Sequence, residues 1–506
     1  MQTGRGPGRA SFTALAVALV TVVALGGCVW IKQASHAVGT AADGDAPSTN
    51  PVLDLAGNYV VFQSDATNLV PGDTNGVTDV FKVGTTNDHV ERVSVAPDGS
   101  QANGASRNPS IDCCGGEVVF ESDASNLVAG DTNGTTDVFV RNMTTKVTSL
   151  VSVASGGGPT DGASTHPSIS SDSRFIAFES TADDIVPGVS GHQVYVRDMQ
   201  SGTTRVVSTS SCAGGGVAGN GTSTGPHLSD DGTTVAFTST STNFAVNPGN
   251  GAPNAYVAPT GSCAVPSFVG VDTTGHALAH GSVATSLDHD GKIVAYDPSG
   301  AAGVYVRDLV AATTTAVDAG DPFATGGALS NDGLTIAIQA SGPSAATSPV
   351  AAVYRVPTGA RLVTSTDASG NVRTVTTGSP VFMTRWSQYF AYAAPGPSSL
   401  PQVFEQTMAP VPTVTGVSPP SVARGSTNVV LKVTGSGFVS GATVYVVASG
   451  VTLGATTYVN ATTLQVPITV ANDATPGSLT VVVANPGGLG ATYGSAGSCN
   501  GCLSVA

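Results

Sequence analysis

Short runs of consecutive apolar residues recur along this chain, separated by stretches rich in Gly, Ser, Thr, Asn and Asp. Residues 59–65 read Tyr-Val-Val-Phe-Gln-Ser-Asp, and residues 117–123 read Glu-Val-Val-Phe-Glu-Ser-Asp. Further copies place an apolar anchor residue at seven positions: Phe62, Phe120, Phe178, Phe237, Tyr296, Ile338 and Tyr392. Most anchors are roughly 60 residues apart, and a fixed period of this kind marks a repeat architecture. A strand with one face in water alternates apolar and polar residues. Consecutive apolar residues therefore predict strands that are packed on both faces.

Each repeat carries the same additional segments around its anchor strand. A Pro-Ser-Ile-Ser strand precedes the anchor at residues 167–170, and a Ser-Asp-Asp-Gly turn occupies residues 229–232. A strand ending in Arg-Asp follows at residues 194–198, and a last strand follows at 204–208. Gly, Asn and Asp supply the turns between such short strands. Four short strands per repeat predict one blade of a β-propeller.

These repeats resemble the TolB-type, WD40-like propeller repeats over residues 51–408. The resemblance implies an all-β propeller of seven blades, with six or eight as alternatives. Residues 36–39 followed by Asp43 echo residues 92–95 followed by Asp98. We therefore expect an N-terminal strand to complete the last blade, since pairing the two ends leaves no exposed sheet edge.

A stiff Pro-Val-Pro segment at residues 410–412 predicts a domain boundary. Beyond it, residues 433–438 read Val-Thr-Gly-Ser-Gly-Phe, and Pro476-Gly477 and residues 481–485 follow in order. This pattern resembles the IPT/TIG family of immunoglobulin-like domains, which implies a small β-sandwich with a spacer or binding role. The expected domains are residues 1–32, an export signal or anchor; 33–409, the propeller; and 410–506, the immunoglobulin-like domain.

The N-terminus has the features of an export signal. Arg5 and Arg9 precede an uncharged run over residues 12–31, and Lys32 follows it. Residues 25–28, Leu-Gly-Gly-Cys, resemble the lipobox of bacterial lipoproteins, which implies lipidation of Cys28. The run is also long enough for an uncleaved membrane-spanning helix. A lipid anchor and a helix both remain open, with simple secretion as a third possibility, and all three place the remaining chain outside the cytoplasm.

The composition restricts the class of binding partner. The net charge is −15 and only 10% of residues are charged. Binding to phosphates needs clustered Lys and Arg, and no such cluster occurs, so a nucleic-acid partner is excluded. Seven cysteines leave six besides Cys28 for disulfides in an oxidising compartment. Cys113 and Cys114 are adjacent, Cys499 and Cys502 can close a small loop, and Cys212 and Cys263 can pair by elimination, although sequence alone does not choose the connectivity.

Two equivalent loops carry candidate metal ligands. Oxygen side chains alternate around a Gly at residues 73–79 and 131–137, and calcium prefers six to eight oxygens. The candidate calcium ligands are Asp73, Asn75, Asp79, Asp131, Asn133 and Asp137. The competing interpretation is local, because Asp and Asn side chains also hold turns through their own backbone. No other cofactor is expected.

Two further motifs predict no active site. The Gly-x-Ser-x-Gly pattern at residues 221–225 lies before a strand, without the strand-to-helix turn of a hydrolase. His276 and His280 lack a helical context and a neighbouring glutamate. We therefore expect a non-enzymatic, membrane-tethered binding or scaffold protein that presents a propeller face to a protein or glycan. The alternatives are an envelope hydrolase or lyase with its site at the channel mouth, which a funnel-lining cluster of Asp, His or Arg would favour, and a spacer without a ligand.

Overall fold

The computed structural model describes residues 31–37, 42–212, 217–299, 302–330, 332–342, 349–365, 372–377, 380–384, 389–407 and parts of 413–505. Within these residues the fold is almost entirely β, apart from one 3-10 turn, Val356–Thr358. The scarcity of helix follows from the abundance of Thr, Val, Ser and Gly, which suit short pleated strands and tight turns.

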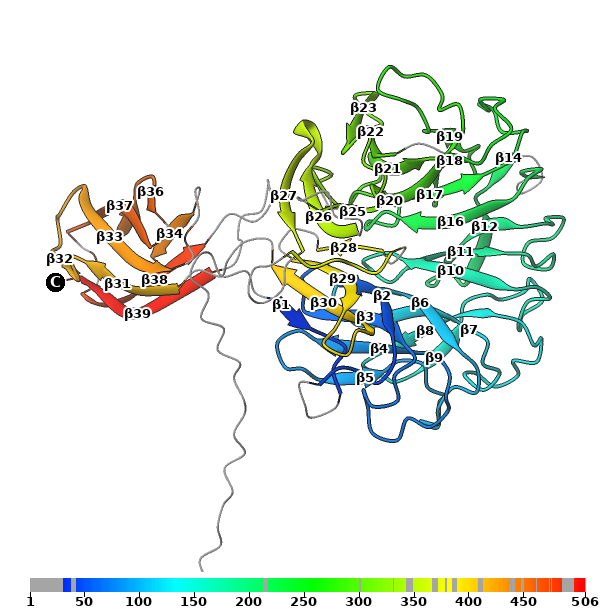
Figure 1. The fold of residues 1–506 in the computed structure, drawn as a ribbon, viewed down its shortest axis with the longest axis horizontal. Coiled ribbons are helices and arrows are strands. Elements are labelled where there is room, and N and C mark those ends of the chain that lie inside the picture. Colours follow the sequence, from blue (N-terminus) through cyan, green and yellow to red (C-terminus); the bar gives the residue numbers. More distant parts are fainter. Residues whose placement is uncertain are drawn as a thin grey trace, which may run out of the picture.

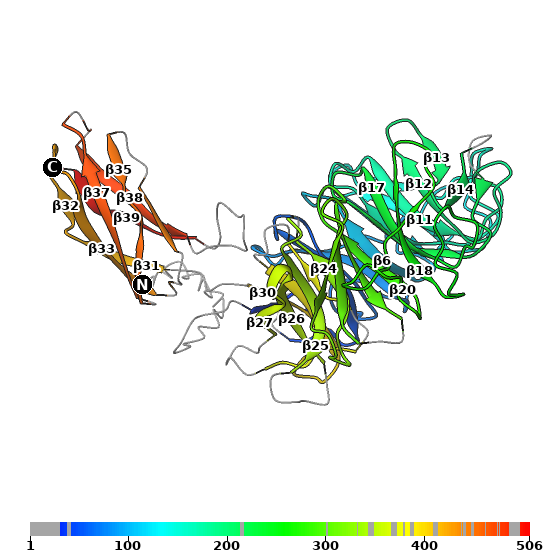
Figure 2. The same cartoon turned by 90° about the horizontal axis from the view of Figure 1, so that it is seen from above.

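Seven four-stranded antiparallel sheets follow one another through the described part of residues 31–407. Figures 1 and 2 show them arranged around a common axis, which confirms the expected β-propeller. Blades 1 and 2 comprise β2 (Ser48–Leu53), β3 (Tyr59–Ser64), β4 (Asp79–Gly84) and β5 (Val90–Arg92), then β6 (Ser106–Ile111), β7 (Glu117–Ser122), β8 (Asp137–Asn142) and β9 (Thr148–Leu150). Blades 3 and 4 comprise β10 (Ser164–Ile169), β11 (Phe175–Ser180), β12 (Gln193–Asp198) and β13 (Thr203–Val206), then β16 (Ser223–Leu228), β17 (Thr234–Ser239), β18 (Asn254–Pro259) and β19 (Ser267–Phe268).

The later repeats, which are weaker in sequence, form the same kind of sheet. Blades 5 and 6 comprise β20 (Ser282–Leu287), β21 (Ile293–Pro298), β22 (Val304–Asp308) and β23 (Thr313–Val317), then β24 (Thr325–Leu329), β25 (Thr335–Ser341), β26 (Pro349–Arg355) and β27 (Ala360–Thr364). Blade 7 comprises β28 (Phe382–Met383), β29 (Tyr389–Pro395), β30 (Pro401–Thr407) and the N-terminal β1 (Ile31–Gln33). A small hairpin of β14 (Thr209–Ser211) and β15 (Val217–Ala218) lies between blades 3 and 4 in the sequence.

The anchor residues form the core of the blades. All seven anchors are fully buried on the second strand of their sheet. In six blades the anchor ring stacks on an aromatic ring of the third strand. These pairs are Phe62–Phe81, Phe120–Phe139, Phe178–Tyr195, Phe237–Tyr256, Tyr296–Tyr305 and Tyr392–Phe404. Ring centroids lie between 5.8 and 6.2 Å apart. Such buried aromatic pairs stabilise a sheet beyond the area they bury.

Small polar residues repeat as regularly as the aromatics. The first residue of the first strand and the last residue of the second strand are both Ser in blades 1 to 4, and their hydroxyls meet: Ser48–Ser64, Ser106–Ser122, Ser164–Ser180 and Ser223–Ser239. At the opposite end, one side chain accepts a backbone N–H across each tight turn: Asp54, Asp112, Ser170, Ser229, Asp288, Ser330 and Thr384. Buried polar groups need such partners, which accounts for the invariant Ser and Asp of the repeat.

The N-terminal strand closes the ring, as expected, but its register was predicted wrongly. Ile31 to Gln33 pair with Gln406 to Phe404 of β30. Gln33, not His36, therefore occupies the place of Arg92, and His36 forms a bridge to Asp43 as Val95 does to Gln101. The error is three residues, because Ile31 and Lys32 belong in sequence to the apolar run and its flank. β1 therefore includes Ile31 and Lys32, which precede the expected propeller boundary at residue 33.

The two ends of each blade differ. The connections after the second and fourth strands lie at one end of the strands, and we call this end the loop face. The tight turns after the first and third strands lie at the other end, which we call the turn face. Connections after the second strand are long in blades 1 to 4, such as residues 65–78, and short in blades 5 to 7, such as residues 299–303. This shortening, together with a shorter connection between β23 and β24, accounts for most of the reduced spacing between Tyr296 and Ile338.

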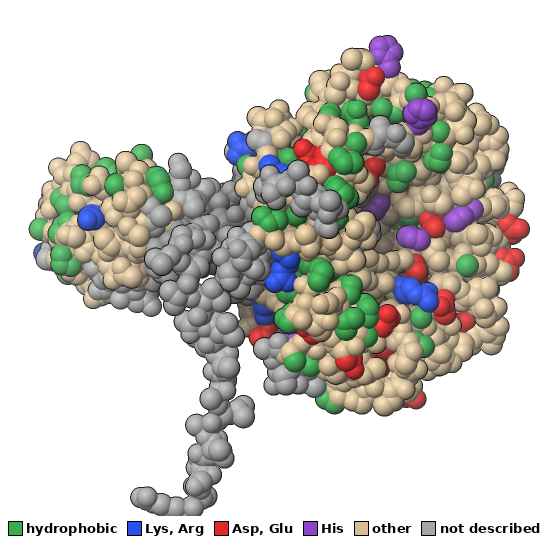
Figure 3. Space-filling view, in the orientation of Figure 1, with side chains coloured by type: hydrophobic (Ala, Val, Ile, Leu, Met, Phe, Trp, Pro, Cys, Tyr) green, Lys and Arg blue, Asp and Glu red, His purple; other side chains and the backbone are tan. Residues whose placement is uncertain are grey.

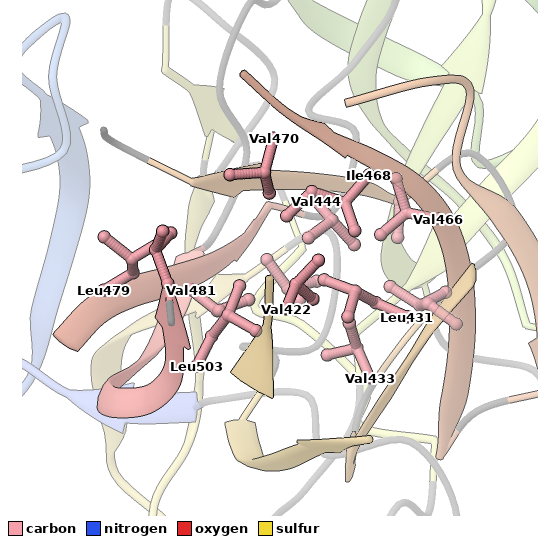
Figure 4. Close-up of a cluster of buried hydrophobic side chains, with 14 of the residues drawn as sticks. Val422, Leu431, Val433, Val444, Val466, Ile468, Val470, Leu479, Val481 and Leu503 are labelled. Atoms are coloured by element: carbon pink, nitrogen blue, oxygen red, sulfur yellow. The ribbon is translucent and has the colours of Figure 1, made fainter. Parts of the chain in front are cut away.

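The C-terminal unit is a two-sheet β-sandwich with its own core. One sheet holds β31 (Thr413–Ser418), β33 (Val429–Ser436), β37 (Thr463–Val470), β35 (Val451–Leu453) and β36 (Thr457–Asn460). The other holds β32 (Ser421–Val422), β39 (Ala496–Val505), β38 (Gly477–Ala484) and β34 (Thr443–Val446). Leu431, Val466 and Val481 lie among the buried side chains between the sheets (Figure 4). Membership of the IPT/TIG family stays a prediction.

Two disulfides are present among the described side chains. Cys212 bonds to Cys263, and the adjacent Cys113 and Cys114 bond to each other in the tight turn of blade 2. The side chains of Cys499 and Cys502 lie outside the described ones, as does Cys28. Across the described residues, no helix has the length and apolar character needed to cross a bilayer. The apolar run at residues 12–30 lies outside them.

Candidate functional site

A channel of about 340 Å³ lies on the propeller axis and is lined by the first strand of every blade. One apolar residue from each blade forms a ring around it: Leu53, Ile111, Ile169, Leu228, Leu287, Leu329 and Met383. Each of these residues is 7–8% exposed, so the seven positions are equivalent despite their different sequences. His227 adds a polar group to the channel wall. Figure 3 shows the hollow at the middle of the propeller, with histidine and acidic side chains near its rim.

Neighbouring blades are joined near the loop-face end of this channel. In blades 1 to 5, the side chain of the residue after the anchor accepts a backbone N–H from the first strand of the next blade. These hydrogen bonds run from Asn108 to Gln63 (3.0 Å), His166 to Glu121 (2.8 Å), Gly225 to Glu179 (2.6 Å), Ala284 to Thr238 (3.0 Å) and Gly326 to Asp297 (2.7 Å). The first strands bulge at this point, which frees the N–H from their own sheet. The interaction holds consecutive blades in register.

In blade 3, three polar side chains gather around this interaction: Glu179, His166 and His192. We call these three side chains the mouth cluster. Oε1 of Glu179 lies 3.2 Å from Nδ1 of His166 and 3.4 Å from Nε2 of His192. The carboxylate is 7% exposed, whereas the His166 side chain is 57% exposed. A buried carboxylate that holds Nδ1 of an exposed imidazole leaves Nε2 directed to solvent, the arrangement that orients a proton-transfer group.

The mouth cluster has a defined electrostatic character. Burial opposes ionisation of Glu179, yet hydrogen bonds from His166, His192 and the Gly225 N–H hold its pKa well below the ordinary value. The hydrogen bond to Glu179 raises the pKa of His166. Deeper in the channel, burial lowers the pKa of His227 to about 4, and the charge of His166 acts in the same direction. At neutral pH His227 is therefore neutral, and the ionised Glu179 favours a protonated His166.

The six predicted calcium ligands lie in two superposable loops on the loop face. Asn75 donates to Asp79 (3.0 Å), and Asn133 donates to Asp137 (2.7 Å). Each Asn also accepts the N–H two residues ahead, from Val77 or Thr135. These contacts are the local turn interactions of the competing interpretation. No group of three or more His, Cys, Asp or Glu side chains arranged for a metal occurs among the described residues, and calcium at these loops stays a proposal.

The other sequence motifs do not converge on the channel mouth. Ser223 of the Gly-x-Ser-x-Gly pattern is fully buried, and its hydroxyl is hydrogen-bonded to that of Ser239. His276 and His280 are exposed in the connection before β20, and His276 contacts Thr274 within the same turn. The mouth cluster was not found from the sequence. Part of the signal was present, since Glu179 follows an anchor as Gln63 and Glu121 do, but the repeat pattern does not place His166 and His192 beside it.

No protein-family model matches the chain, and no curated protein matches it. Among solved structures, the chain resembles TolB from Acinetobacter baumannii at 13% identity and a TM-score of 0.36, over 64% of this chain and 64% of that one. It resembles an oligogalacturonate lyase from Vibrio parahaemolyticus at 11% identity and a TM-score of 0.47, over 75% and 96% of the two chains. It also resembles the propeller domain of the Trilobed protease from Pyrococcus furiosus at 10% identity and a TM-score of 0.43, over 71% and 95%. At these identities and TM-scores, none of the three assigns an activity to this chain.

Proposed function

We propose that this chain is a binding or scaffold protein, held at the membrane outside the cytoplasm by its N-terminus, that presents the loop face of its propeller to a protein or glycan. One observation carries the proposal. The first described residue, Ile31, pairs with Gln406 near the end of β30, so both ends of the propeller lie at the turn face of blade 7. A tether attached before Ile31 leaves the opposite, loop face unobstructed, and binding residues commonly reside on loops held by a rigid scaffold.

The charge of the loop face restricts the ligand. Exposed carboxylates stand on the connections of blades 1 to 3: Asp45, Asp65, Asp98, Asp123, Asp161 and Asp183. Arg107 pairs with Asp123, and Arg92 is buried. A like-charged ligand would be repelled, so the face favours a basic protein surface or a neutral glycan.

Recovery of a partner tests the proposal. The full chain would be cross-linked in its own envelope and purified. Three lysines placed on the loop face (Ala129→Lys, Thr132→Lys and Val246→Lys) should reduce recovery of one stoichiometric partner at least tenfold. The matched control places three lysines on exposed turn-face positions (Thr145→Lys, Gln200→Lys and Val310→Lys) and should leave recovery unchanged. Equal recovery from both variants would contradict a loop-face site.

A second candidate function is catalysis at the channel mouth, and the mouth cluster is the observation that favours it. His166 is exposed and oriented by Glu179, as a general acid or base requires. Purified full-length chain would be incubated with cell-wall glycan fragments, and products would be separated by chromatography. Turnover that is lost in His166→Ala and retained in His276→Ala would establish this function. The absence of turnover in the parent chain leaves binding as the role of the loop face.

A further inference from the structure

The loops of blades 1 and 2 share a hydrogen-bond pattern but differ in one charged neighbour. In blade 1, Arg92 of β5 places one guanidinium nitrogen 3.0 Å from Asp73 and the other 3.7 Å from Asp79. All three side chains are at most 7% exposed. Blade 1 therefore buries two carboxylates together with the cation that neutralises them.

Blade 2 keeps both carboxylates and lacks the cation. Arg92 lies opposite Phe81 in blade 1, and the residue opposite Phe139 in blade 2 is Leu150. Asp131 and Asp137 are 7% and 0% exposed. Within the part of the chain that the structure describes, neither forms an ion pair with Lys, Arg or His. Adjacent carboxylates buried without a counter-charge are costly.

Blades 3 and 4 have neutral amide side chains at the position of Asp79 and Asp137. Gln193 stands where blades 1 and 2 have Asp79 and Asp137, and Asn254 takes the same place in blade 4. Gln193 accepts from Ser208 as Asp137 accepts from Ser152, so the turn forms equally well around a neutral amide. The carboxylate of Asp137 is therefore not needed for the turn.

A further oxygen distinguishes the blade 2 loop. The hydroxyl of Thr135 is buried and has no hydrogen-bond partner among the described residues, whereas Val77 holds the equivalent position in blade 1. Blade 2 thus replaces a cation with Leu150 and an apolar side chain with an oxygen donor. Both differences add to the capacity of the loop for a bound cation that prefers oxygen.

We propose that the blade 2 loop binds one Ca²⁺ through Asp131, Asp137 and the Thr135 hydroxyl, in the place that the Arg92 guanidinium fills in blade 1. Loop carbonyls and water would complete the six to eight oxygens that Ca²⁺ prefers. The blade 1 loop binds none, because Arg92 already pairs with both of its carboxylates. The proposed site thus keeps two of the six ligands expected from the sequence pattern, Asp131 and Asp137, and adds the Thr135 hydroxyl.

Equilibrium dialysis of the full chain with Ca²⁺ alone, followed by thermal unfolding with Ca²⁺ or a chelator, tests the proposal. The parent chain should bind one Ca²⁺ and melt at least 3 °C higher with Ca²⁺, a shift expected for a site in excess ligand. Leu150→Arg, which copies blade 1, should lose binding and the shift, and Leu150→Met should retain both.

Asp131→Asn keeps the test decisive where Leu150→Arg fails to fold, because it removes the charge of one proposed ligand and leaves the size of the side chain nearly unchanged. Asp131→Asn should reduce binding at least tenfold. A parent chain that binds no Ca²⁺ at millimolar concentration would overturn the proposal. Binding that persists in both Leu150→Arg and Asp131→Asn would overturn it equally.

Discussion

At the scale of single residues, the buried serine pairs are as diagnostic of the blades as the aromatic anchors. Ser106 and Ser122 are at most 1% exposed, and their hydroxyl oxygens lie 2.9 Å apart. The Ser122 hydroxyl also accepts the N–H of Ala124, at the start of the long connection to β8. One side chain thus joins the first strand, the second strand and the loop.

Ser122→Ala should lower the free energy of unfolding by about 1–3 kcal/mol, because it leaves a buried hydroxyl and a backbone N–H without partners. The double variant Ser106→Ala/Ser122→Ala should cost less than the sum of the single changes, since no hydroxyl is then stranded. Urea unfolding measures both quantities. Thr144→Ala, at an exposed turn, is the control and should stay within about 0.5 kcal/mol of the parent. Additive costs would contradict the pairing.

The mouth cluster makes a second prediction at this scale. Glu179→Gln removes the negative charge beside His166, so the pKa of His166 should fall toward its ordinary value of about 6.5. Histidine resonances followed by NMR titration measure the change. His276, which lies in another connection, serves as the control within the same spectrum. An unchanged His166 titration would exclude the Glu179–His166 contact.

The serine pairs can be found from the sequence more readily than the mouth cluster can. The Ser and anchor positions recur in every strong repeat, so reading one blade against the next finds them. The mouth cluster joins His166, Glu179 and His192 around a bulge and a long connection. Within the described part of the propeller only blade 3 has this combination, so a comparison restricted to shared residues passes over it.

At the scale of elements, the strand that pairs with the closing strand β1 carries a buried acid. Glu405 of β30 lies opposite Lys32 of β1 and is 1% exposed. Neither carboxylate oxygen has a hydrogen-bond partner among the described residues. Burial raises its pKa to about 8, although Lys32 acts in the opposite direction.

A raised carboxyl pKa makes the closure sensitive to pH. Between the unfolded pKa, about 4.3, and the folded value of about 8, the folded state holds a proton that the unfolded state has released, so stability falls as pH rises. Glu405→Gln should remove this decline and raise the urea midpoint at pH 8.5 more than at pH 5. Glu91→Gln, at a half-buried position of β5, should follow the parent chain. A parallel decline in Glu405→Gln would contradict the assignment.

The register of the closing strand shows where sequence reasoning reaches its limit at this scale. The echo between residues 36–39 and 92–95 correctly indicated that an N-terminal segment completes blade 7. The displacement by three residues arose because β1 has only three residues, too few for a pattern of its own. Its position depends on tertiary contacts, such as the Ser35 hydroxyl with Gln402 (2.8 Å), that pair residues far apart in the chain.

At the scale of the whole molecule, ring closure couples the first and last parts of the propeller. A chain that starts at Ser35 lacks β1 and exposes the edge of β30, which is open to pairing with another chain. We expect it to unfold at a lower temperature and to self-associate as its concentration rises. A chain that starts at Trp30 retains β1 and should remain monomeric. Calorimetry and light scattering compare the two, and identical behaviour would show that β1 is dispensable.

The all-β class and the blade motif followed from repetition and turn chemistry, which are local properties. The uneven loop face did not. Long connections are confined to blades 1 to 4, and the weak later repeats concealed how short the connections at 299–303 and 396–400 are. The loop face therefore has longer connections on one side of the propeller axis than on the other.

The meeting of both propeller ends at blade 7 has a mechanical consequence. β1 and β30 are antiparallel, and Ile31 lies beside Gln406 at the ends from which the chain leaves. A pull between the N-terminal segment and the sandwich would therefore open the three residue pairs one after another, rather than loading them together. Sequential rupture needs little force, so the blade 7 seam would yield before any interior blade. Single-molecule stretching from both ends should show an early, low-force event that is absent when a designed disulfide joins β1 to β30.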